Sequence, residues 1–192
     1  MKIGVLALQG DFFEHQQLLA MIGVASTQVR LPAELEGLDG LIIPGGESTT
    51  IGKMAEDFAM INPLREFGLT RAIFGTCAGS ILLSKDVRRT QPLLGLMDIR
   101  VARNAFGRQV DSFEIDLEVP CLADVAEPNP PFHAVFIRAP LIEEVGKGVE
   151  VLARLPDGVI VAAKQGRWLA TSFHPELTRD ARFHQYFVEM AR

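Results

Sequence analysis

Short runs of apolar residues, each bounded by glycine or polar residues, recur along the first half of the chain. Ile3 to Leu8 is one such run and Gly40 to Ile43 is another. Runs of this length are typical of parallel strands that are buried on both faces. A helix from Asp11, as its N-cap, to about Ile22 separates them, and another helix begins near Thr50. This alternation predicts a mainly parallel sheet covered by helices on both faces.

The second half of the chain has shorter strand candidates, and turn residues join the last three of them. Asp157-Gly158 and Gln165-Gly166 have the composition of hairpin turns. The strand candidates are Ile99 to Ala102, Phe113 to Leu117, Ala134 to Ile137, Val149 to Leu155, Val159 to Ala163 and Trp168 to Ser172. A final helix is predicted from about Arg179 to Met190. We therefore predict an α/β fold, a single domain over residues 1–192 whose mixed, mainly parallel sheet has an antiparallel extension.

The composition of the chain argues against some kinds of binding partner and indicates the cellular compartment. The 192 residues carry a net charge of −5 and have no long run of Lys or Arg, which argues against a nucleic-acid partner. No stretch approaches the roughly 20 apolar residues of a membrane span, and the N-terminal apolar run is too short for a signal core. Two cysteines make a disulfide framework improbable. We expect a cytoplasmic protein that binds no membrane.

Cys77 lies where a predicted strand, opened by Ile73-Phe74, breaks into a glycine-flanked turn. Gly75, Ala78 and Gly79 are the small neighbours that such a tight turn requires. The thiol would lie at the start of the next helix, where unpaired N–H groups and the helix dipole favour the thiolate, its reactive form. This setting predicts a nucleophile for covalent acyl transfer. Cys121 has no such setting and is interpreted as a small apolar residue.

His174 and Glu176 are the candidates for the base and for the group that orients it. They follow the last predicted strand, and functional groups of open α/β sheets gather at the carboxyl ends of strands. Pro175 fixes the backbone between them, so that the carboxylate can turn back to the imidazole. A zinc site is not supported because the Pro-Cys-x-x-Cys half of a deaminase signature is absent, and no metal is expected. The other histidines, His15, His133 and His184, are interpreted as structural.

The glycine-rich run from Gly45 to Thr50 differs from a phosphate-binding loop in its spacing, and Met54 stands after Lys53 where such a loop has Ser or Thr. A backbone N–H near Gly46 and that of Ala78 could instead form an oxyanion hole. A plain strand-to-helix turn is the alternative interpretation. Arg103 and Arg138 lie beside strand candidates, where an arginine fork would suit a substrate carboxylate. From spacing alone, surface arginines remain the alternative.

The motifs together resemble a known enzyme family. Phe74 to Gly79 resembles the nucleophile elbow of class I, triad-type glutamine amidotransferases, and His174 to Glu176 resembles their other two triad members. Within that class the chain is most similar to the glutaminase subunits of pyridoxal 5′-phosphate synthases. Six motifs carry this resemblance: Leu8 to Gly10, Pro44 to Thr50, Arg103 to Glu114, Phe136 to Pro140, Ala162 to Gly166 and Ser172 to Thr178.

The resemblance implies a flavodoxin-like glutaminase. Cys77 would attack the side-chain amide of L-glutamine, His174 would protonate the leaving ammonia, and Glu176 would orient His174. Water would then release L-glutamate from the thioester. Ammonia would pass to a separate synthase subunit that makes pyridoxal 5′-phosphate, which is a product and not a cofactor of this chain. The glutamine contacts implied by the resemblance are Gly46, Glu47, Ser48, Arg103, Ile137 and Arg138.

Two other functions remain open at this point. One is a catalytically silent subunit that only docks on the synthase, against which the intact Cys77, His174 and Glu176 argue. The other is a cysteine hydrolase or chaperone of the related flavodoxin-like families, which lack the late His-Pro-Glu sequence. Release of ammonia from glutamine would separate these functions from a glutaminase.

Overall fold

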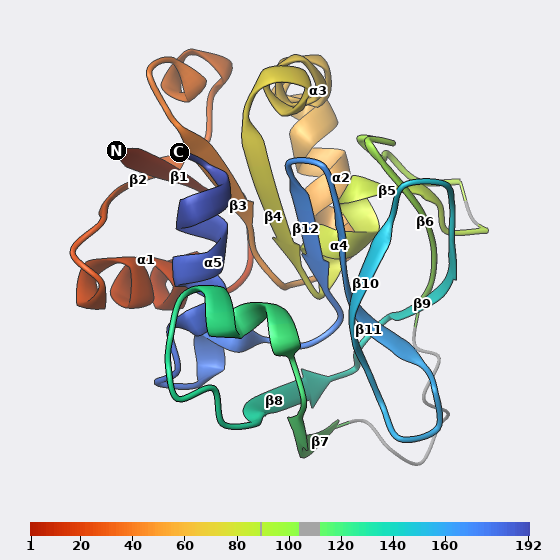
Figure 1. Ribbon diagram of the computed structural model, residues 1–192. Coiled ribbons are helices and arrows are strands. Elements are labelled where there is room, and N and C mark those ends of the chain that lie inside the picture. The colour runs from red at the N-terminus through yellow and green to blue at the C-terminus, as the bar shows by residue number, and fades with distance from the viewer. Residues whose placement is uncertain (89, 104–111) are drawn as a thin grey trace.

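One large sheet organises the molecule (Figure 1). The computed structural model describes residues 1–88, 90–103 and 112–192. The sheet has ten strands in the order β2-β1-β3-β4-β12-β11-β9-β6-β5, and β10 pairs with β11 outside this path. Its strands are β1 (Lys2–Leu6), β2 (Ala25–Val29), β3 (Gly40–Ile43), β4 (Ala72–Thr76), β5 (Ser84–Asp86), β6 (Met97–Ala102), β9 (Leu141–Val145), β10 (Glu150–Arg154), β11 (Ile160–Gln165) and β12 (Trp168–Thr171).

The sheet is parallel on one side and mainly antiparallel on the other. Strands β2, β1, β3, β4 and β12 all run parallel, whereas β11 is antiparallel to β12, β10 and β9. This confirms the predicted α/β fold with a mixed, mainly parallel sheet and an antiparallel extension. Two strands, β7 (Ser112–Leu117) and β8 (Phe132–Ile137), form a separate antiparallel ribbon. The strands β5 and β9 were not predicted.

Helices cover both faces of the sheet (Figure 1). The α-helices are α1 (Phe12–Met21), α2 (Ser48–Asp57), α3 (Ile61–Thr70), α4 (Ala78–Leu83) and α5 (Arg182–Met190), and the 3₁₀ turns are η1 (Pro32–Leu35), η2 (Pro120–Asp124) and η3 (Pro175–Leu177). Helices α1 and α5 pack on one face, and α2, α3 and α4 pack on the other. None of the helices in the described part of the chain is long and apolar enough to cross a membrane.

Alternation along the central strands gives each face its own core. In β3, Ile42 packs in the core beneath α1 and α5, while Leu41 and Ile43 pack in the core beneath α2, α3 and α4. In β4, Phe74 and Ile73 divide between the two faces in the same way. All five side chains are fully buried. The apolar runs predicted as doubly covered strands are therefore buried on both faces, as such strands must be.

The position of β12 between β4 and β11 determines where the functional groups lie. β12 pairs in parallel register with β4, so that Thr171 is opposite Thr76. The backbone N–H of the next residue, Cys77, donates to the carbonyl of Thr171 at 2.8 Å. The segments that follow the two strands therefore leave the same edge of the sheet side by side.

Local details differ from the sequence-based expectations at two places. Asp11 occupies the N-cap position of α1, but its side chain makes no capping hydrogen bond with the described residues. The final helix begins at Arg182 instead of Arg179, because the η3 turn and Asp180 precede it. The middle of the Arg103 to Glu114 motif, residues 104–111, lies outside the described residues.

Candidate active site

Cys77 stands at the tight turn between β4 and α4. Its backbone has φ 46° and ψ −106°, a region that non-glycine residues rarely occupy and that is common at functional sites. The turn depends on small neighbours: a Cβ on Gly79 would lie 2.0 Å from the carbonyl oxygen of Ile43. Ser80 strengthens the turn by donating its hydroxyl to the Cys77 carbonyl at 2.7 Å. The predicted elbow is thus present, with Cys77 almost buried.

His174 and Glu176 lie directly beyond β12, beside the turn that holds Cys77. Glu176 belongs to η3, and its Oε1 is 2.7 Å from Nδ1 of His174. Both side chains are buried. The backbone N–H of His174 donates to Val135 of β8 at 2.9 Å, which ties the segment to the ribbon. The structure therefore brings Cys77 together with two residues from near the other end of the chain.

The environment of His174 favours its protonated form. Burial alone would lower its pKa, but hydrogen bonds to Cys77 and Glu176, together with their negative charges, raise the pKa of His174 to about 10. Burial raises the pKa of Glu176, and the bond to His174 opposes that shift. At neutral pH the arrangement therefore supports an imidazolium beside the Cys77 sulfur, which places a proton donor next to a candidate nucleophile.

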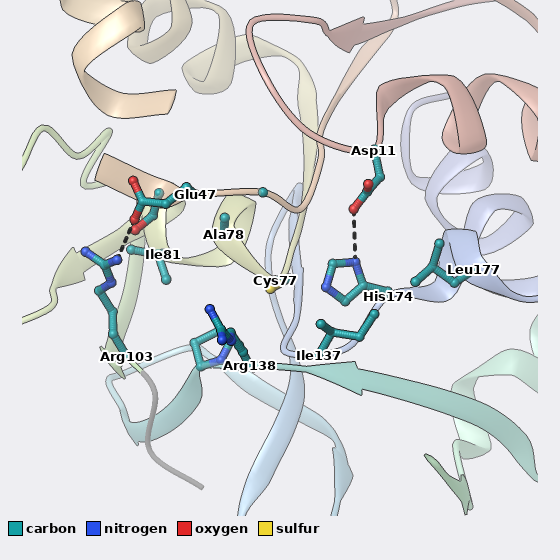
Figure 2. Close-up of a pocket in the computed structure, with 13 residues that line it drawn as sticks. Asp11, Glu47, Cys77, Ala78, Ile81, Arg103, Ile137, Arg138, His174 and Leu177 are labelled. Atoms are coloured by element: carbon teal, nitrogen blue, oxygen red, sulfur yellow. Dashed lines mark hydrogen bonds and ion pairs between the residues drawn. The ribbon is translucent and has the colours of Figure 1, made fainter. Parts of the chain in front are cut away.

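Asp11 provides a second carboxylate beside the imidazole. Its Oδ2 lies 3.5 Å from His174 Nδ1 (Figure 2). Glu176 contacts the same nitrogen atom. Burial raises the pKa of Asp11, partly offset by the charge of His174. The sequence indicated Asp11 only as a helix cap, because the residues around Asp11 give no sign of a contact with His174, which is far away in the chain.

These groups face a cavity of about 410 Å³ (Figure 2). Its lining residues are Asp11, Gly46, Glu47, Ser48, Cys77, Ala78, Ile81, Arg103, Ile137, Arg138, Pro140, His174 and Leu177. Every candidate site residue named from the sequence is among them except Glu176, which lies behind His174. Four lining residues were not anticipated as site residues: Asp11, Ile81, Pro140 and Leu177. Their local sequences carry no chemical signal, since they are ordinary helix, turn or loop residues.

The two candidate oxyanion donors line this cavity from two segments, the glycine-rich loop after β3 and the start of α4. Ala78 is the first residue of α4, where backbone N–H groups have no partner within the helix. Gly46 has φ 149°, and a Cβ there would lie 2.5 Å from Oε1 of Gln9. That same Gln9 oxygen accepts the backbone N–H of Glu47 at 2.8 Å. The glycine-rich loop is therefore anchored by Gln9, and it requires glycine at this position.

Glu47 and Arg103 form an ion pair at the rim, with Nη2 of Arg103 2.6 Å from Oε1 of Glu47. Burial would raise the pKa of Glu47, but hydrogen bonds from Thr49 and Thr50 lower it to about 2. Arg103 also donates to Gln91 at 3.1 Å. Arg138, which also lines the cavity, has φ 45°, a strained conformation for a non-glycine residue. Two guanidinium groups and the ionised carboxylate of Glu47 are thus among the groups that line the cavity.

The remaining candidates lie elsewhere. His133 is exposed on β8, where its ring nitrogens are 2.8 Å from Asp116 and 3.0 Å from Glu114. Cys121 lies in η2, and burial is the main cause that raises the pKa of its thiol to about 11. Neither lines the cavity. His15 and His184 are fully buried and form a contact chain that ends at Glu176.

One group in the described part of the chain has the donor atoms to hold a metal ion: Asp11, His174 and Glu176, within 4.8 Å of one another. A cation there would compete with the proton that His174 Nδ1 shares with Glu176 Oε1. The donor set is thus already used by an internal hydrogen bond, and we assign no metal to it.

Comparisons with known proteins agree on one family. Residues 5–192 match the model of the SNO glutamine amidotransferase family. The chain is 58% identical to the pyridoxal 5′-phosphate synthase subunit PdxT of Herpetosiphon aurantiacus, over 98% of this chain and 99% of that protein. It is 57% identical to the PdxT subunit of Pelotomaculum thermopropionicum, over 98% and 94%. A crystal structure of a glutamine amidotransferase superposes with a TM-score of 0.90 at 52% identity, covering 98% of both chains.

Proposed function

The chain belongs to the SNO glutamine amidotransferase family, and from this premise we propose that it is the glutaminase subunit of a pyridoxal 5′-phosphate synthase. It hydrolyses L-glutamine to L-glutamate and ammonia, and residues 1–192 act as one glutaminase domain. The observation that carries the proposal is the buried Cys77–His174–Glu176 arrangement at the wall of a cavity large enough for an amino acid. The description of the family points to glutamine as the substrate, and the relatives' names point to the complex.

The reaction begins with attack of the Cys77 thiolate on the side-chain amide carbon of glutamine. Charge develops on the amide oxygen, which the backbone N–H groups of Gly46 and Ala78 stabilise. His174 gives its proton to the nitrogen, the C–N bond breaks, and ammonia leaves a thioester on Cys77. His174, now neutral, takes a proton from water as the water attacks the thioester. The tetrahedral intermediate collapses, glutamate leaves, and the thiolate and imidazolium are restored.

Charges around the cavity match those of a free amino acid. The ionised Glu47 suits the α-ammonium group of glutamine, and the guanidinium groups of Arg103 and Arg138 suit its α-carboxylate. The substrate contacts that we propose are Gly46, Glu47, Ser48, Arg103, Ile137 and Arg138. Glu176 does not touch the substrate: it orients His174 and stabilises its charge.

Ammonia then passes to the synthase subunit of the same complex, where it is used to make pyridoxal 5′-phosphate. Amide hydrolysis through the triad needs no cofactor, and we place the reaction in the cytoplasm, with both cysteines as free thiols. A subunit that only docks on the synthase would have no use for a thiol held beside an imidazolium. For that reason we favour the enzyme over the silent binding subunit.

A glutaminase assay with and without the synthase subunit tests this function. We expect glutamate release that the synthase subunit increases and that Cys77→Ala abolishes. A glutamine-like electrophile should label Cys77 in the complex. Absence of both glutamate release and labelling, with the synthase subunit bound, would contradict the proposed activity and support the silent subunit.

A further inference from the structure

A chain of buried polar groups continues from Glu176 into the core beneath α1 and α5. His15 of α1 places its Nε2 3.5 Å from Oε2 of Glu176 and 3.2 Å from the hydroxyl of Thr76. Its Nδ1 is 2.8 Å from Nε2 of His184 on α5. All four side chains are at least nine-tenths buried. A catalytic mechanism that uses only Cys77, His174 and Glu176 gives these contacts no role.

Glu176 has an unsatisfied oxygen in this arrangement. Oε1 contacts His174, but Oε2 is buried without a hydrogen-bond partner among the described residues. Leaving a buried carboxylate oxygen unpaired is unfavourable. His15 Nε2, at the outer limit of hydrogen-bonding distance, is placed to satisfy it. Hydrogen bonds of catalytic groups are often long in the free enzyme and shorten in the substrate complex.

The contacts of His184 select which nitrogen of His15 carries the proton. Nδ1 of His184 is buried without a partner among the described residues, and an unpaired N–H is rarer in proteins than an unpaired acceptor. His184 therefore carries its proton on Nε2 and donates it to Nδ1 of His15. That leaves the proton of His15 on Nε2, directed toward Thr76 and Glu176. The opposite tautomer would place a lone pair of His15 against the carboxylate.

We propose that His15 is a positioning residue for the triad, whose Nε2–H holds the Glu176 carboxylate in line with His174. The inference rests on the proposed function, since it assigns His15 a role through the same triad. It gives His15 a role beyond the structural one that the sequence alone indicated. Its neighbour His184 fixes the tautomer and acts only through His15.

The surroundings keep His15 neutral, as this role requires. Burial lowers the pKa of His15 well below its usual value, and the charges of His184 and His174 lower it further. The titratable groups that face it are His184 from α5, Glu176 from η3 and His174 from the loop before η3. On the strand side it meets the uncharged Thr76 and the edge of the Phe74 ring. A neutral donor can satisfy Glu176 without replacing His174 as its counter-ion.

Two substitutions of equal polarity separate positioning from structure. In His15→Gln, the amide nitrogen can reach the place of imidazole Nε2, next to Glu176. In His15→Asn, the shorter amide reaches only the place of Nδ1, next to His184. We expect His15→Asn to lower kcat for glutamine hydrolysis about tenfold to a hundredfold, the usual effect of losing a hydrogen bond to a charged group. KM should hardly change, and His15→Gln should recover most of kcat.

The pH dependence of kcat distinguishes the two roles, because the loss of a purely structural residue would not shift it. Without the donor, the Glu176 carboxylate is no longer held in line with His174 and stabilises the charged imidazole less. The pKa of His174 therefore falls, and the alkaline limb of the kcat profile shifts to lower pH in His15→Asn. His15→Gln should keep the limb close to that of the parent protein. Equal kcat values and equal profiles for the two variants, whether high or low, would overturn the proposal.

A measurement on the unsubstituted protein covers the case in which His15→Asn does not fold. Nitrogen-15 NMR of the histidine-labelled protein at neutral pH should show His15 as the neutral Nε2–H tautomer. A proton on Nδ1, or a charged ring, would overturn the proposal. If the parent protein shows no Cys77-dependent glutaminase activity while the tautomer is as expected, the proposed function fails and the geometry of His15 stands.

Discussion

Nδ1 of His174 lies 2.7 Å from Oε1 of Glu176 and 3.5 Å from Oδ2 of Asp11, so two carboxylates share one imidazole nitrogen. They are not equivalent. Glu176 is fully enclosed, whereas the Asp11 side chain is 40% exposed, and water weakens its interaction with His174. The nearer, buried carboxylate is therefore expected to control the orientation of the ring.

Glu176→Gln should lower kcat about 10³-fold or more, because an amide in this place stabilises the wrong imidazole tautomer. Asp11→Asn should lower kcat less than about fivefold, in keeping with the small effect of exposed ion pairs. Steady-state glutamine hydrolysis by both variants, assayed with the synthase subunit, checks the difference. Similar losses in the two variants would mean that Asp11 shares the orienting role.

Cys77→Ala should reduce glutamine hydrolysis to background while the synthase complex still forms, because the substitution removes only the sulfur. Cys121→Ala is the matched control. It should keep the parental kcat, since Cys121 lies outside the cavity and its pKa of about 11 leaves it protonated. Ammonia release and gel filtration of the mixed subunits measure the two properties. Residual turnover by Cys77→Ala would contradict the assignment of the nucleophile.

Gly45→Ala should impair catalysis without removing any catalytic group. A Cβ at this position would lie 2.4 Å from Cε1 of His174, so the ring would have to leave its place beside Glu176. We expect kcat to fall by about 10²-fold, a loss typical of misplacement by about 1 Å. Gly68→Ala on α3 is the control, because its Cβ would meet the end of Leu96 at the same 2.4 Å, away from the cavity. Equal kcat values for the two variants would argue against this effect.

The buried histidines should make folding stability depend on pH. Burial lowers the pKa of His184 to about 3, whereas an unfolded chain titrates near the usual 6.5. The unfolded state therefore binds the proton first, so that stability is complete above about pH 6.5 and is lost as the pH falls toward about 3. The slope is about 1.4 kcal/mol per pH unit for each such histidine. Urea unfolding at pH 7, 6 and 5 measures it.

Variants assign that slope to a residue. In His184→Gln the side chain cannot titrate. This variant should therefore lose less folding stability at acid pH, by the contribution of one histidine. His133→Gln should leave the loss of stability at acid pH unchanged. His133 is exposed, and its carboxylate partners raise its pKa, so that its contribution to stability changes only above about pH 6.5. An unchanged acid-side slope in His184→Gln would show that this ring does not titrate as its burial predicts.

Arg103→Lys should weaken glutamine binding more than it slows the chemical step. The guanidinium is a planar fork that can serve Glu47 and a substrate carboxylate together, while an ammonium is a single point of charge. We expect KM to rise about tenfold, with kcat changed less than about threefold. Initial rates over a range of glutamine concentrations separate the two parameters. A drop confined to kcat would place Arg103 in the catalytic step instead.

The sequence predicted those features that local chemistry specifies. The glycines around Cys77 predict a tight turn, because a bulkier side chain has no room in such a turn. The structure confirms this at Gly79, whose backbone lies close to that of Ile43. The apolar run Gly40 to Ile43 matches β3 in both bounds, since a strand covered on two faces must be apolar throughout. The α/β fold was predictable for the same reason, whereas the antiparallel extension was predictable from the hairpin-turn residues Asp157-Gly158 and Gln165-Gly166.

Features that depend on distant contacts were not predictable. Strand β5 has three residues, Ser84 to Asp86, and no apolar pattern, so only its pairing with β6 makes it a strand. His15 and His184 are 169 positions apart and occupy ordinary places on helices α1 and α5. Nothing in either local sequence distinguishes a ring that contacts Glu176 from one that merely fills the core. Tertiary packing alone supplies that information.

The insertion of β12 between β4 and β11 has a consequence for how the enzyme is made. The ribosome makes Cys77 early, but the neighbouring strand and its histidine come only at residues 168–174. Until then β4 has an unpaired edge in the middle of the future sheet, and the thiol has no imidazole beside it. In a growing chain the two groups therefore cannot meet before residue 174 has been made, and we expect no release of ammonia until then.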